Sequence, residues 1–271
     1  MQFDREKTIA ITGSASGIGL SLRQSLELKG ATVIGIDLKD AEVIADLSNR
    51  EGRSQAIAET LDQANGVLDG VVTSAGVGPP CDPAKMISIN WLGTVQLLTG
   101  LREGLLSSKS NAKVVAVSSN STTITPNVPE VLIDACLEFH EEKIQAILED
   151  YSGMAAMAIA YAASKTAVAR FVRRTAPTTE WAGSGIRLNA IAPGAILTPL
   201  LQGGLDDEEF GDAIRTLPVP VGDFGSPEII AEWIEMMLSD AADFMCGSVV
   251  VVDGGSDALI RPDDWPQSFT I

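Results

Sequence analysis

The chain has 271 residues, 45% of them apolar, which is enough for one large α/β domain. Its formal net charge of −17 argues against nucleic acid and membranes as partners, because phosphate groups are bound by clustered lysine and arginine. The three cysteines are scattered, which argues against a disulfide scaffold and suits a reducing cytoplasm. The single histidine, His140, leaves too few imidazoles for a histidine metal site, so no metal is expected. No signal peptide or membrane-spanning run is evident.

The N-terminal segment reads as a strand, a glycine-rich turn and a helix. Residues 8–11 are apolar, residues 12–19 contain three glycines, and residues 20–28 are amphipathic. Glycines let the backbone approach a pyrophosphate, and the N–H groups at a helix start bind its charge. The turn therefore predicts a phosphate-binding site.

A second strand, residues 32–36, ends at Asp37, about twenty residues after the glycines. A carboxylate at this position accepts hydrogen bonds from an adenosine ribose and repels a 2′-phosphate. We therefore expect NAD rather than NADP as cofactor. The alternative is an acid in a surface turn.

Strands and helices continue to alternate along the chain. Further strands are predicted at residues 43–45, 70–73, 112–117, 185–191 and 247–252, and helices at 51–61, 87–106, 154–172 and 227–238. Strands without polar alternation, separated by helices, indicate a parallel sheet covered on both faces. The predicted fold is a doubly wound Rossmann sheet forming a single domain over residues 1–271. Ligands of such sheets bind at the carboxyl ends of the strands. That edge holds Gly13, Asp37, Asp46, Gly76 and Ser119.

Three segments depart from this alternation. Residues 120–156 have apolar positions at helical spacing opposite a row of acids, which predicts an inserted helical hairpin. Residues 195–217 are rich in leucine and predict a lid over the substrate. Residues 261–271 contain two prolines and a tryptophan, which is typical of an extended arm.

Tyr161 and Lys165 lie four residues apart in the helix predicted at 154–172, so their side chains share one face. A phenol has an unperturbed pKa of about 10 and is a poor base at neutral pH. We expect the nearby ammonium to favour the phenolate and to lower the pKa of Tyr161, which suits acid–base catalysis. The alternative is a packed tyrosine beside a solvated lysine.

Together these motifs resemble the short-chain dehydrogenase/reductase family over nearly the whole chain. The resemblance rests on the glycine spacing from Thr12 to Gly19, on Asn90 and Ser119, on Tyr161 with Lys165, and on Pro193-Gly194. Residues 36–48, residues 187–205 and the long insertion are most similar to the branch of bacterial 3α-hydroxysteroid dehydrogenases/carbonyl reductases. In one departure, the family's usual Asn-Ala-Gly is Ser74-Ala75-Gly76 here.

The resemblance implies an NAD-dependent oxidoreductase in which Tyr161 is the acid/base and Lys165 lowers its pKa and binds the nicotinamide ribose. Ser119 would orient the substrate oxygen, and Asn90 would hold a water in a proton relay. Ser118 is a rival for the Ser119 role, but adjacent strand residues face opposite ways, so only one reaches the cleft. The implied cofactor-binding residues are Gly13, Ser16, Gly17, Ile18, Gly19, Asp37, Asp46, Leu47, Ala75, Gly76, Tyr161, Lys165, Pro193, Gly194, Ala195, Ile196 and Thr198.

The apolar lid favours a bulky apolar secondary alcohol or ketone as substrate, such as a hydroxysteroid, terpenoid or aryl alcohol. One alternative is an epimerase or dehydratase of nucleotide sugars, which also uses a Tyr-x-x-x-Lys pair with bound NAD. The other is a non-catalytic NAD-binding regulator. Family members are mostly dimers or tetramers, so a homodimer or homotetramer is expected.

Overall fold

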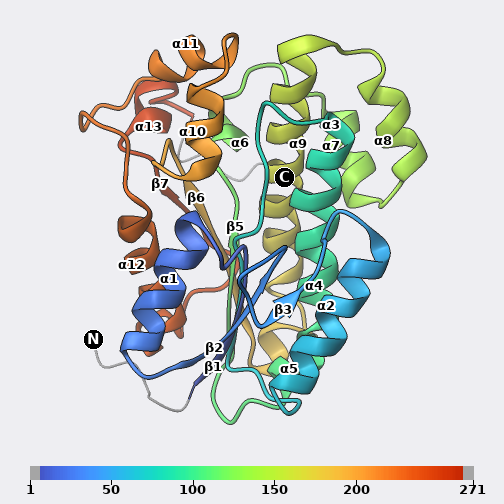
Figure 1. Cartoon of the computed structure of the whole chain (residues 1–271), viewed down its shortest axis with the longest axis vertical. Coiled ribbons are helices and arrows are strands. Elements are labelled where there is room, and N and C mark those ends of the chain that lie inside the picture. Colours follow the sequence, from blue (N-terminus) through green and yellow to red (C-terminus); the bar gives the residue numbers. More distant parts are fainter. Residues whose placement is uncertain (1–6, 265–271) are drawn as a thin grey trace.

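One parallel β-sheet organises the molecule (Figure 1). The structure is a computed structural model and describes residues 7–264. The seven strands in this part of the chain are ordered β3-β2-β1-β4-β5-β6-β7, and every neighbouring pair is parallel. The strands are β1 (Thr8–Thr12), β2 (Thr32–Asp37), β3 (Val43–Ile44), β4 (Gly70–Thr73), β5 (Lys113–Val117), β6 (Arg187–Pro193) and β7 (Val249–Val252).

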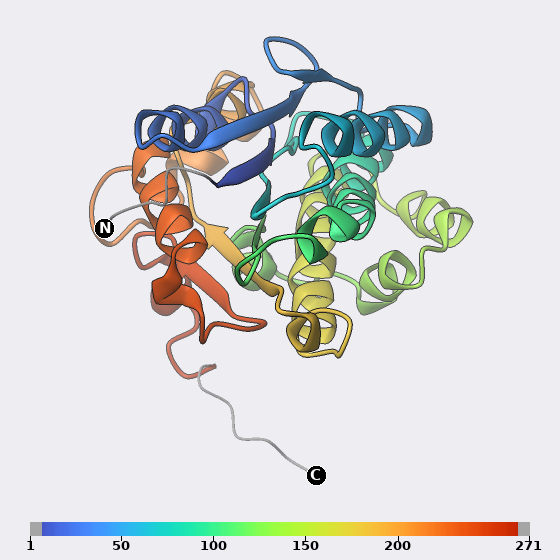
Figure 2. The same cartoon turned by 90° about the horizontal axis from the view of Figure 1, so that it is seen from below.

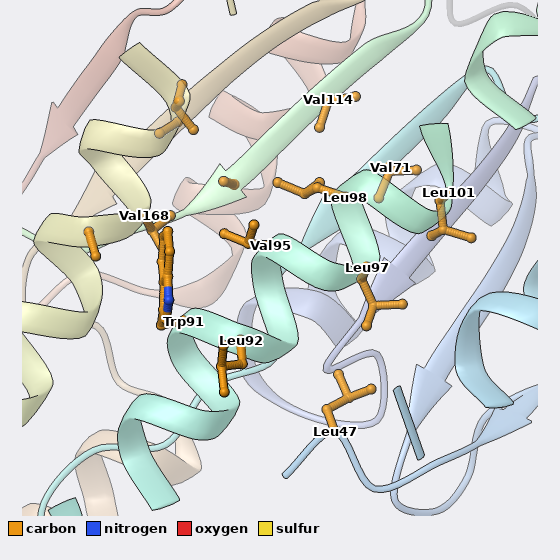
Figure 3. Packing of buried hydrophobic residues seen from close by; sticks show 14 of the residues in the cluster. Leu47, Val71, Trp91, Leu92, Val95, Leu97, Leu98, Leu101, Val114 and Val168 are labelled. Carbon is orange, nitrogen blue, oxygen red and sulfur yellow. The ribbon is translucent and has the colours of Figure 1, made fainter. Parts of the chain in front are cut away.

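Helices cover both faces of the sheet, as Figures 1 and 2 show. On one face, α1 (Gly17–Leu28) and α12 (Pro227–Leu238) contact each other and bury a smaller apolar cluster. On the other, α2 (Arg50–Gln63), α4 (Thr94–Gly100) and α9 (Gly153–Thr175) bury a larger cluster that includes Trp91 (Figure 3). The predicted doubly wound parallel sheet is confirmed. Strands β4 and β5 are buried at every position, which explains why both are apolar apart from Thr73 and from Lys113, whose ammonium pairs with Asp243.

The single long helix predicted over residues 87–106 is wrong. This segment is instead divided into α3 (Pro83–Ile87), a π-helical turn (Ser88–Gly93), α4 and α5 (Arg102–Leu106). A π turn admits one extra residue per turn and is common at functional sites. Apolar periodicity does not reveal it, because every residue from 90 to 95 is buried and no polar face marks the register. Asn90 lies within this π turn.

The segment between β5 and α9 is helical, as predicted. It contains α6 (Ser121–Ile124), α7 (Glu130–Leu137) and α8 (Glu141–Leu148), and α7 packs on both α8 and α9. A bidentate ion pair from Arg170 to Glu130 ties α7 to α9. Between α7 and α8, Phe139 lies 5.4 Å from Trp91, measured between ring centres. His140 begins α8, and its Nδ1 accepts a hydrogen bond from the Lys143 N–H.

The predicted lid segment forms α10 (Pro199–Leu205) and α11 (Phe210–Arg215), which contact each other above the carboxyl ends of the strands (Figure 1). The remaining short helices are Ala182–Ser184, Asp240–Ala242 and α13 (Ser256–Ile260). Within residues 7–264, no helix is both long and apolar enough to cross a bilayer. Over the same residues, no cluster of three or more His, Cys, Asp or Glu side chains is placed to hold a metal ion. The predicted arm at 261–271 falls mostly outside the described residues.

Candidate active site

A cavity of about 440 Å³ opens at the carboxyl ends of the strands, beside the point between β1 and β4 where the strand order reverses. Open α/β sheets bind their ligands at such a switch point. Its wall is formed by the glycine turn, the loops after β2, β4, β5 and β6, and the α10–α11 segment. All the sequence-predicted site residues line it except Gly19 and Asn90.

The glycine turn at one end of the cavity is closely packed. Gly13 has a φ of 70°, and a Cβ built on it would lie 2.8 Å from the Cα of Ala75. Gly19 lies behind the wall, where a Cβ would approach the Gly13 carbonyl oxygen to 2.2 Å. At the start of α1, no side chain caps the helix and the first turn holds no acid. The positive end of the helix is therefore left to an anionic ligand.

Asp37 stands at the end of β2, next to this turn. One carboxylate oxygen accepts from the Ala15 N–H at 2.9 Å, and the other accepts from the Leu38 N–H at 2.7 Å. Each oxygen keeps a further lone pair for a ligand hydroxyl. The glycine turn and the predicted ribose acid are thus held together by a direct hydrogen bond.

Asp46 and Leu47 line the same end of the cavity. Hydrogen bonds from the Ser48 N–H and hydroxyl lower the pKa of Asp46. Behind them lies Arg53, which is 5% exposed and donates to the Leu47 carbonyl and to the Ser88 hydroxyl. Arg53 is not identifiable from the sequence, because an arginine in a polar helix carries no sign that it is buried.

At the other end of the cavity, Tyr161 and Lys165 both project from α9. The Lys165 Nζ lies 5.9 Å from the centre of the Tyr161 ring and donates to the Val117 carbonyl at 3.0 Å. Ser119 hydrogen-bonds Tyr161, which brings the predicted substrate-orienting hydroxyl to the predicted base. Ser119, which is distant in sequence from Tyr161 and Lys165, thus meets them in one place.

The prediction that the Lys165 ammonium lowers the pKa of Tyr161 is wrong for this structure, in which the pKa of Tyr161 is raised. Burial raises the pKa of Tyr161, and the hydrogen bond from Ser119 only partly opposes this. Burial also lowers the pKa of Lys165 to about 8. Desolvation disfavours the charged form of each group. The sequence argument considered the charge of the lysine but not the burial of both side chains.

Ser118 and Ser119 direct their hydroxyls to different partners. The Ser118 hydroxyl donates to the Lys165 carbonyl at 2.9 Å, whereas the Ser119 hydroxyl accepts from the Ser121 N–H and bonds Tyr161. Ser118 therefore anchors α9 to β5, while Ser119 faces the phenol. Both residues line the cavity, contrary to the expectation that only one would reach it, but only the Ser119 hydroxyl hydrogen-bonds the phenol.

Asn90 is fully buried behind the cavity wall. Its Oδ1 accepts from the Val77 N–H, and its Nδ2 donates to the Val77 carbonyl, both at 2.9 Å. It also donates to the Ser164 hydroxyl. A Cβ on Gly76 would lie 3.1 Å from the Asn90 Oδ1 and 3.3 Å from the Lys165 Nζ. Asn90 is thus near Lys165, but its side chain holds the segment after β4.

Other loops complete the wall. After β4, the Ala75 N–H donates to the Thr12 hydroxyl at 3.0 Å. A threonine on β1 therefore holds the segment Ser74-Ala75-Gly76, which stands where the family usually has Asn-Ala-Gly. After β6, the Thr198 hydroxyl accepts from the Leu201 N–H and begins α10. The residues of this loop that line the cavity include Pro193, Gly194, Ala195, Ile196 and Thr198.

Part of the wall near Tyr161 was not anticipated. The unexpected residues are Val77, Gly78, Pro79, Ile124 and Thr125. They line the cavity together with the lid residues Leu200, Leu201, Phe210, Ile214 and Leu217. The position of residues 77–79 directly after β4, at the ligand-binding edge, is the signal that could have identified them. No charged side chain belongs to this part of the wall.

Comparison with known proteins gives a consistent result. Residues 7–128 match the family model described as short chain dehydrogenase, and residues 144–257 match the one described as Enoyl-(Acyl carrier protein) reductase. The chain is 40% identical to the 3-alpha-hydroxysteroid dehydrogenase/carbonyl reductase of Comamonas testosteroni, over 94% of this chain and 98% of that protein. It is 30% identical to the coniferyl-alcohol dehydrogenase of a Pseudomonas species, over 92% of this chain and 96% of that one.

Among solved structures, the 3-alpha-hydroxysteroid dehydrogenase from Pseudomonas sp. B-0831, complexed with NADH, superposes with a TM-score of 0.89. The two sequences are 41% identical, and the match covers 95% of this chain and 99% of that one. Fold, motif positions and these identities agree over nearly the full length. The chain therefore belongs to the short-chain dehydrogenase family.

Proposed function

We propose that the protein is an NAD(H)-dependent oxidoreductase that interconverts a bulky apolar secondary alcohol and its ketone. The observation that carries this proposal is the meeting of Tyr161, Ser119 and Lys165 in the same cavity as the glycine turn and Asp37. A proton-transfer group and a dinucleotide-type site in one cavity are what hydride transfer to or from an alcohol requires.

The residues present fit NAD. Glycines form a turn with no room for side chains, and the start of α1 has no side-chain cap. Asp37 keeps carboxylate lone pairs for ribose hydroxyls and would repel a 2′-phosphate. Asp46 and Leu47 would lie at the adenine, and Ala195, Ile196 and Thr198 at the nicotinamide end. When bound, NAD would accept the hydride from the alcohol carbon, or return it to the ketone.

The chain's own residues would move the proton. The Tyr161 phenolate would take the proton of the alcohol during oxidation, and the resulting phenol would give it back during reduction. Ser119, already bonded to Tyr161, orients the substrate oxygen. Lys165 supplies a buried positive charge that favours the phenolate as it forms, and would bind the ribose hydroxyls. Asn90 holds the segment after β4 near Lys165, where the relay water predicted from the family would be bound.

The uncharged wall around Tyr161 supports an apolar substrate. Leucine, isoleucine and phenylalanine of the α10–α11 segment face Val77 and Ile124 across the cavity. Apart from Lys165, whose ammonium donates to the Val117 carbonyl, this wall offers no cationic partner to a carboxylate or phosphate of the substrate. The same lack of basic residues argues against the nucleotide-sugar epimerase or dehydratase, whose substrates carry a diphosphate.

The direct test is a screen of steroid, terpenoid and aryl secondary alcohols with NAD, followed by absorbance of the NADH formed. We expect turnover with at least one fused-ring or aryl alcohol. Activity confined to small polar polyols would overturn the substrate class. Cofactor that stays bound through desalting, with no net reduction, would favour the epimerase. Cofactor binding without turnover of any kind would favour the regulator.

We also propose a cytoplasmic location and a homodimer or homotetramer. The three cysteines are all unpaired, which supports a reducing compartment. Exposed apolar side chains on α12 and β7, including Ile229, Trp233 and Val251, support self-association. Sedimentation at several protein concentrations tests the assembly, and a monomer throughout would contradict it.

A further inference from the structure

We propose that Arg53 is a positioning residue for the cofactor, because its buried guanidinium fixes the backbone of the adenine loop, residues 46–48, which follows β3. The inference rests on the proposed function, which puts the adenine of NAD at Asp46 and Leu47. It adds a residue that does not itself line the active-site cavity. Arg53 would act from behind the wall, through the loop that the adenine contacts.

The guanidinium of Arg53 donates to acceptors in three different parts of the chain. They are the Leu47 carbonyl of the adenine loop at 3.0 Å, the Ser88 hydroxyl of the π turn at 3.2 Å and the Gln96 Oε1 of α4 at 2.8 Å. The Ser88 hydroxyl in turn donates to the Ser48 carbonyl at 2.6 Å. Two successive carbonyls of the adenine loop are therefore connected to the π turn through one arginine.

The adenine loop also packs closely against the elements on either side of it. A Cβ built on Gly52 of α2 would lie 2.0 Å from the Asp46 carbonyl oxygen. A Cβ built on Gly93 of the π turn would lie 3.5 Å from the Leu47 Cβ. The Leu47 side chain belongs to the larger apolar cluster (Figure 3). The loop thus lies between α2 and the π turn, and Arg53 supplies hydrogen bonds across that contact.

A guanidinium is costly in this place, so filling space does not explain it. Arg53 is 5% exposed, and burial lowers the pKa of its guanidinium. Attraction to Glu141 of α8 opposes this effect, and both side chains line a second, polar cavity. An apolar side chain of similar volume often fills a buried site at lower cost. The hydrogen bonds of Arg53, rather than its bulk, are therefore what distinguishes it here.

Loss of the guanidinium should weaken the adenine end of the cofactor site and spare the reacting end. Within residues 7–264, neither Tyr161 nor Lys165 is hydrogen-bonded to Arg53 or to the adenine loop. Asn90 lies in the same π turn as the arginine's partner, but it is held separately by the backbone of Val77. Affinity for the adenosine half of NAD should fall, whereas the rate of the bound complex should not.

The experiment compares Arg53→Met with Arg50→Met by calorimetric titration of NAD and of ADP. ADP carries the adenosine and both phosphates of NAD but lacks the nicotinamide half. Arg50 lies on the same helix, is exposed and does not line the active-site cavity, so its loss removes the same charge from the surface.

We expect Arg53→Met to raise the Kd of NAD and the Kd of ADP by the same factor, about tenfold, as for a lost hydrogen bond to a charged group. Arg50→Met should leave both constants within about threefold of wild type, because exposed charges contribute little. With an alcohol that wild type oxidises, kcat at saturating NAD should be unchanged in Arg53→Met.

A second variant keeps the test decisive if Arg53→Met does not fold. Ser88→Ala removes one small hydroxyl, and with it both the hydrogen bond to the Ser48 carbonyl and one acceptor of Arg53. The Kd of ADP should then rise about threefold, the effect of one neutral hydrogen bond.

Several outcomes would overturn the role of Arg53. They are an unchanged Kd of ADP in Arg53→Met or in Ser88→Ala, an equal rise in Arg50→Met, a rise for NAD alone, or a loss of kcat as large as the loss of affinity. The deciding readouts are binding constants, which need no turnover. A protein that binds NAD and oxidises no tested alcohol would therefore contradict the proposed function and leave this inference standing.

Discussion

The Lys165 Nζ lies 5.9 Å from the centre of the Tyr161 ring, one helical turn further along α9, and donates to the carbonyl of Val117 on β5. This places a cation beside the phenol without direct contact between the ammonium and the hydroxyl oxygen. Both groups are desolvated, which raises the pKa of Tyr161 and lowers that of Lys165. At neutral pH the phenol therefore stays protonated, while the ammonium, with a pKa of about 8, stays largely charged, and a large part of the reactivity must come from what binds beside the pair.

Replacing Tyr161 by Phe tests the proposed base most directly. The variant keeps the ring and loses the hydroxyl, so alcohol oxidation should fall by at least about a hundredfold, the low end for general acid–base catalysis. NAD affinity, measured by fluorescence titration, should stay close to wild type. Tyr151, the only other tyrosine, does not line the cavity, and Tyr151→Phe is the matched control. Full turnover in Tyr161→Phe would disprove the assignment.

The pH dependence should be opposite in the two directions of the reaction. Oxidation needs the phenolate of Tyr161 as acceptor, and burial raises the pKa of this phenol. The fraction of phenolate therefore grows as the pH rises through the alkaline range. Steady-state kcat/KM from about pH 6 to about pH 10 should increase for the alcohol and decrease for the ketone. An alcohol profile that is flat or falls with pH would contradict Tyr161 as the base.

Stability should also depend on pH through Lys165. Burial lowers its pKa from 10.5 to about 8, so between these values the unfolded chain binds more protons than the folded one. Burying the Lys165 charge lowers the free energy of unfolding by its full amount below pH 8, and this loss disappears as the pH rises towards 10.5. Lys165→Met should therefore be more stable than wild type at neutral pH, by up to about 3 kcal/mol. Urea unfolding of both proteins at two pH values measures this difference.

The informative quantity is the difference between Lys165→Met and wild type, because other titrating groups cancel in it. It should shrink steadily from pH 8 to pH 10.5. A difference that is the same at both ends would show that methionine stabilises by packing alone, and that the lysine charge is not the cause.

Cofactor choice should follow the charge on Asp37. Asp37→Asn keeps the size of the side chain and removes the charge that repels a 2′-phosphate. We expect kcat/KM with NAD to fall about tenfold or more, as for a lost hydrogen bond to a charged group, while kcat/KM with NADP rises. Asp40→Asn removes the same charge from an exposed position three residues away that does not line the cavity. If both variants shift the NAD to NADP ratio equally, Asp37 acts only through net charge.

Much of the fold was predictable because its signals are local. The apolar residues 71–72 of β4 and 114–117 of β5 indicate parallel strands buried on both faces, whatever their neighbours are. The glycine turn and Asp37 follow two such strands, and parallel strands end at one edge, so their meeting was predictable as well. The π turn at Ser88–Gly93 was not predictable, since residues 90–95 are all buried and no polar face records the shift in register.

The sequence by itself determined the parallel sheet, the edge at which a ligand binds, and the spacing that puts a phenol and an ammonium on one helix face. These features depend on residues that are close in sequence, or on the regular spacing of apolar residues within strands and helices. Only the tertiary structure decided the direction in which the pKa of Tyr161 shifts and the use of Asn90 to hold Val77. Burial and free space are produced by packing segments that are distant in sequence, and no local pattern records them.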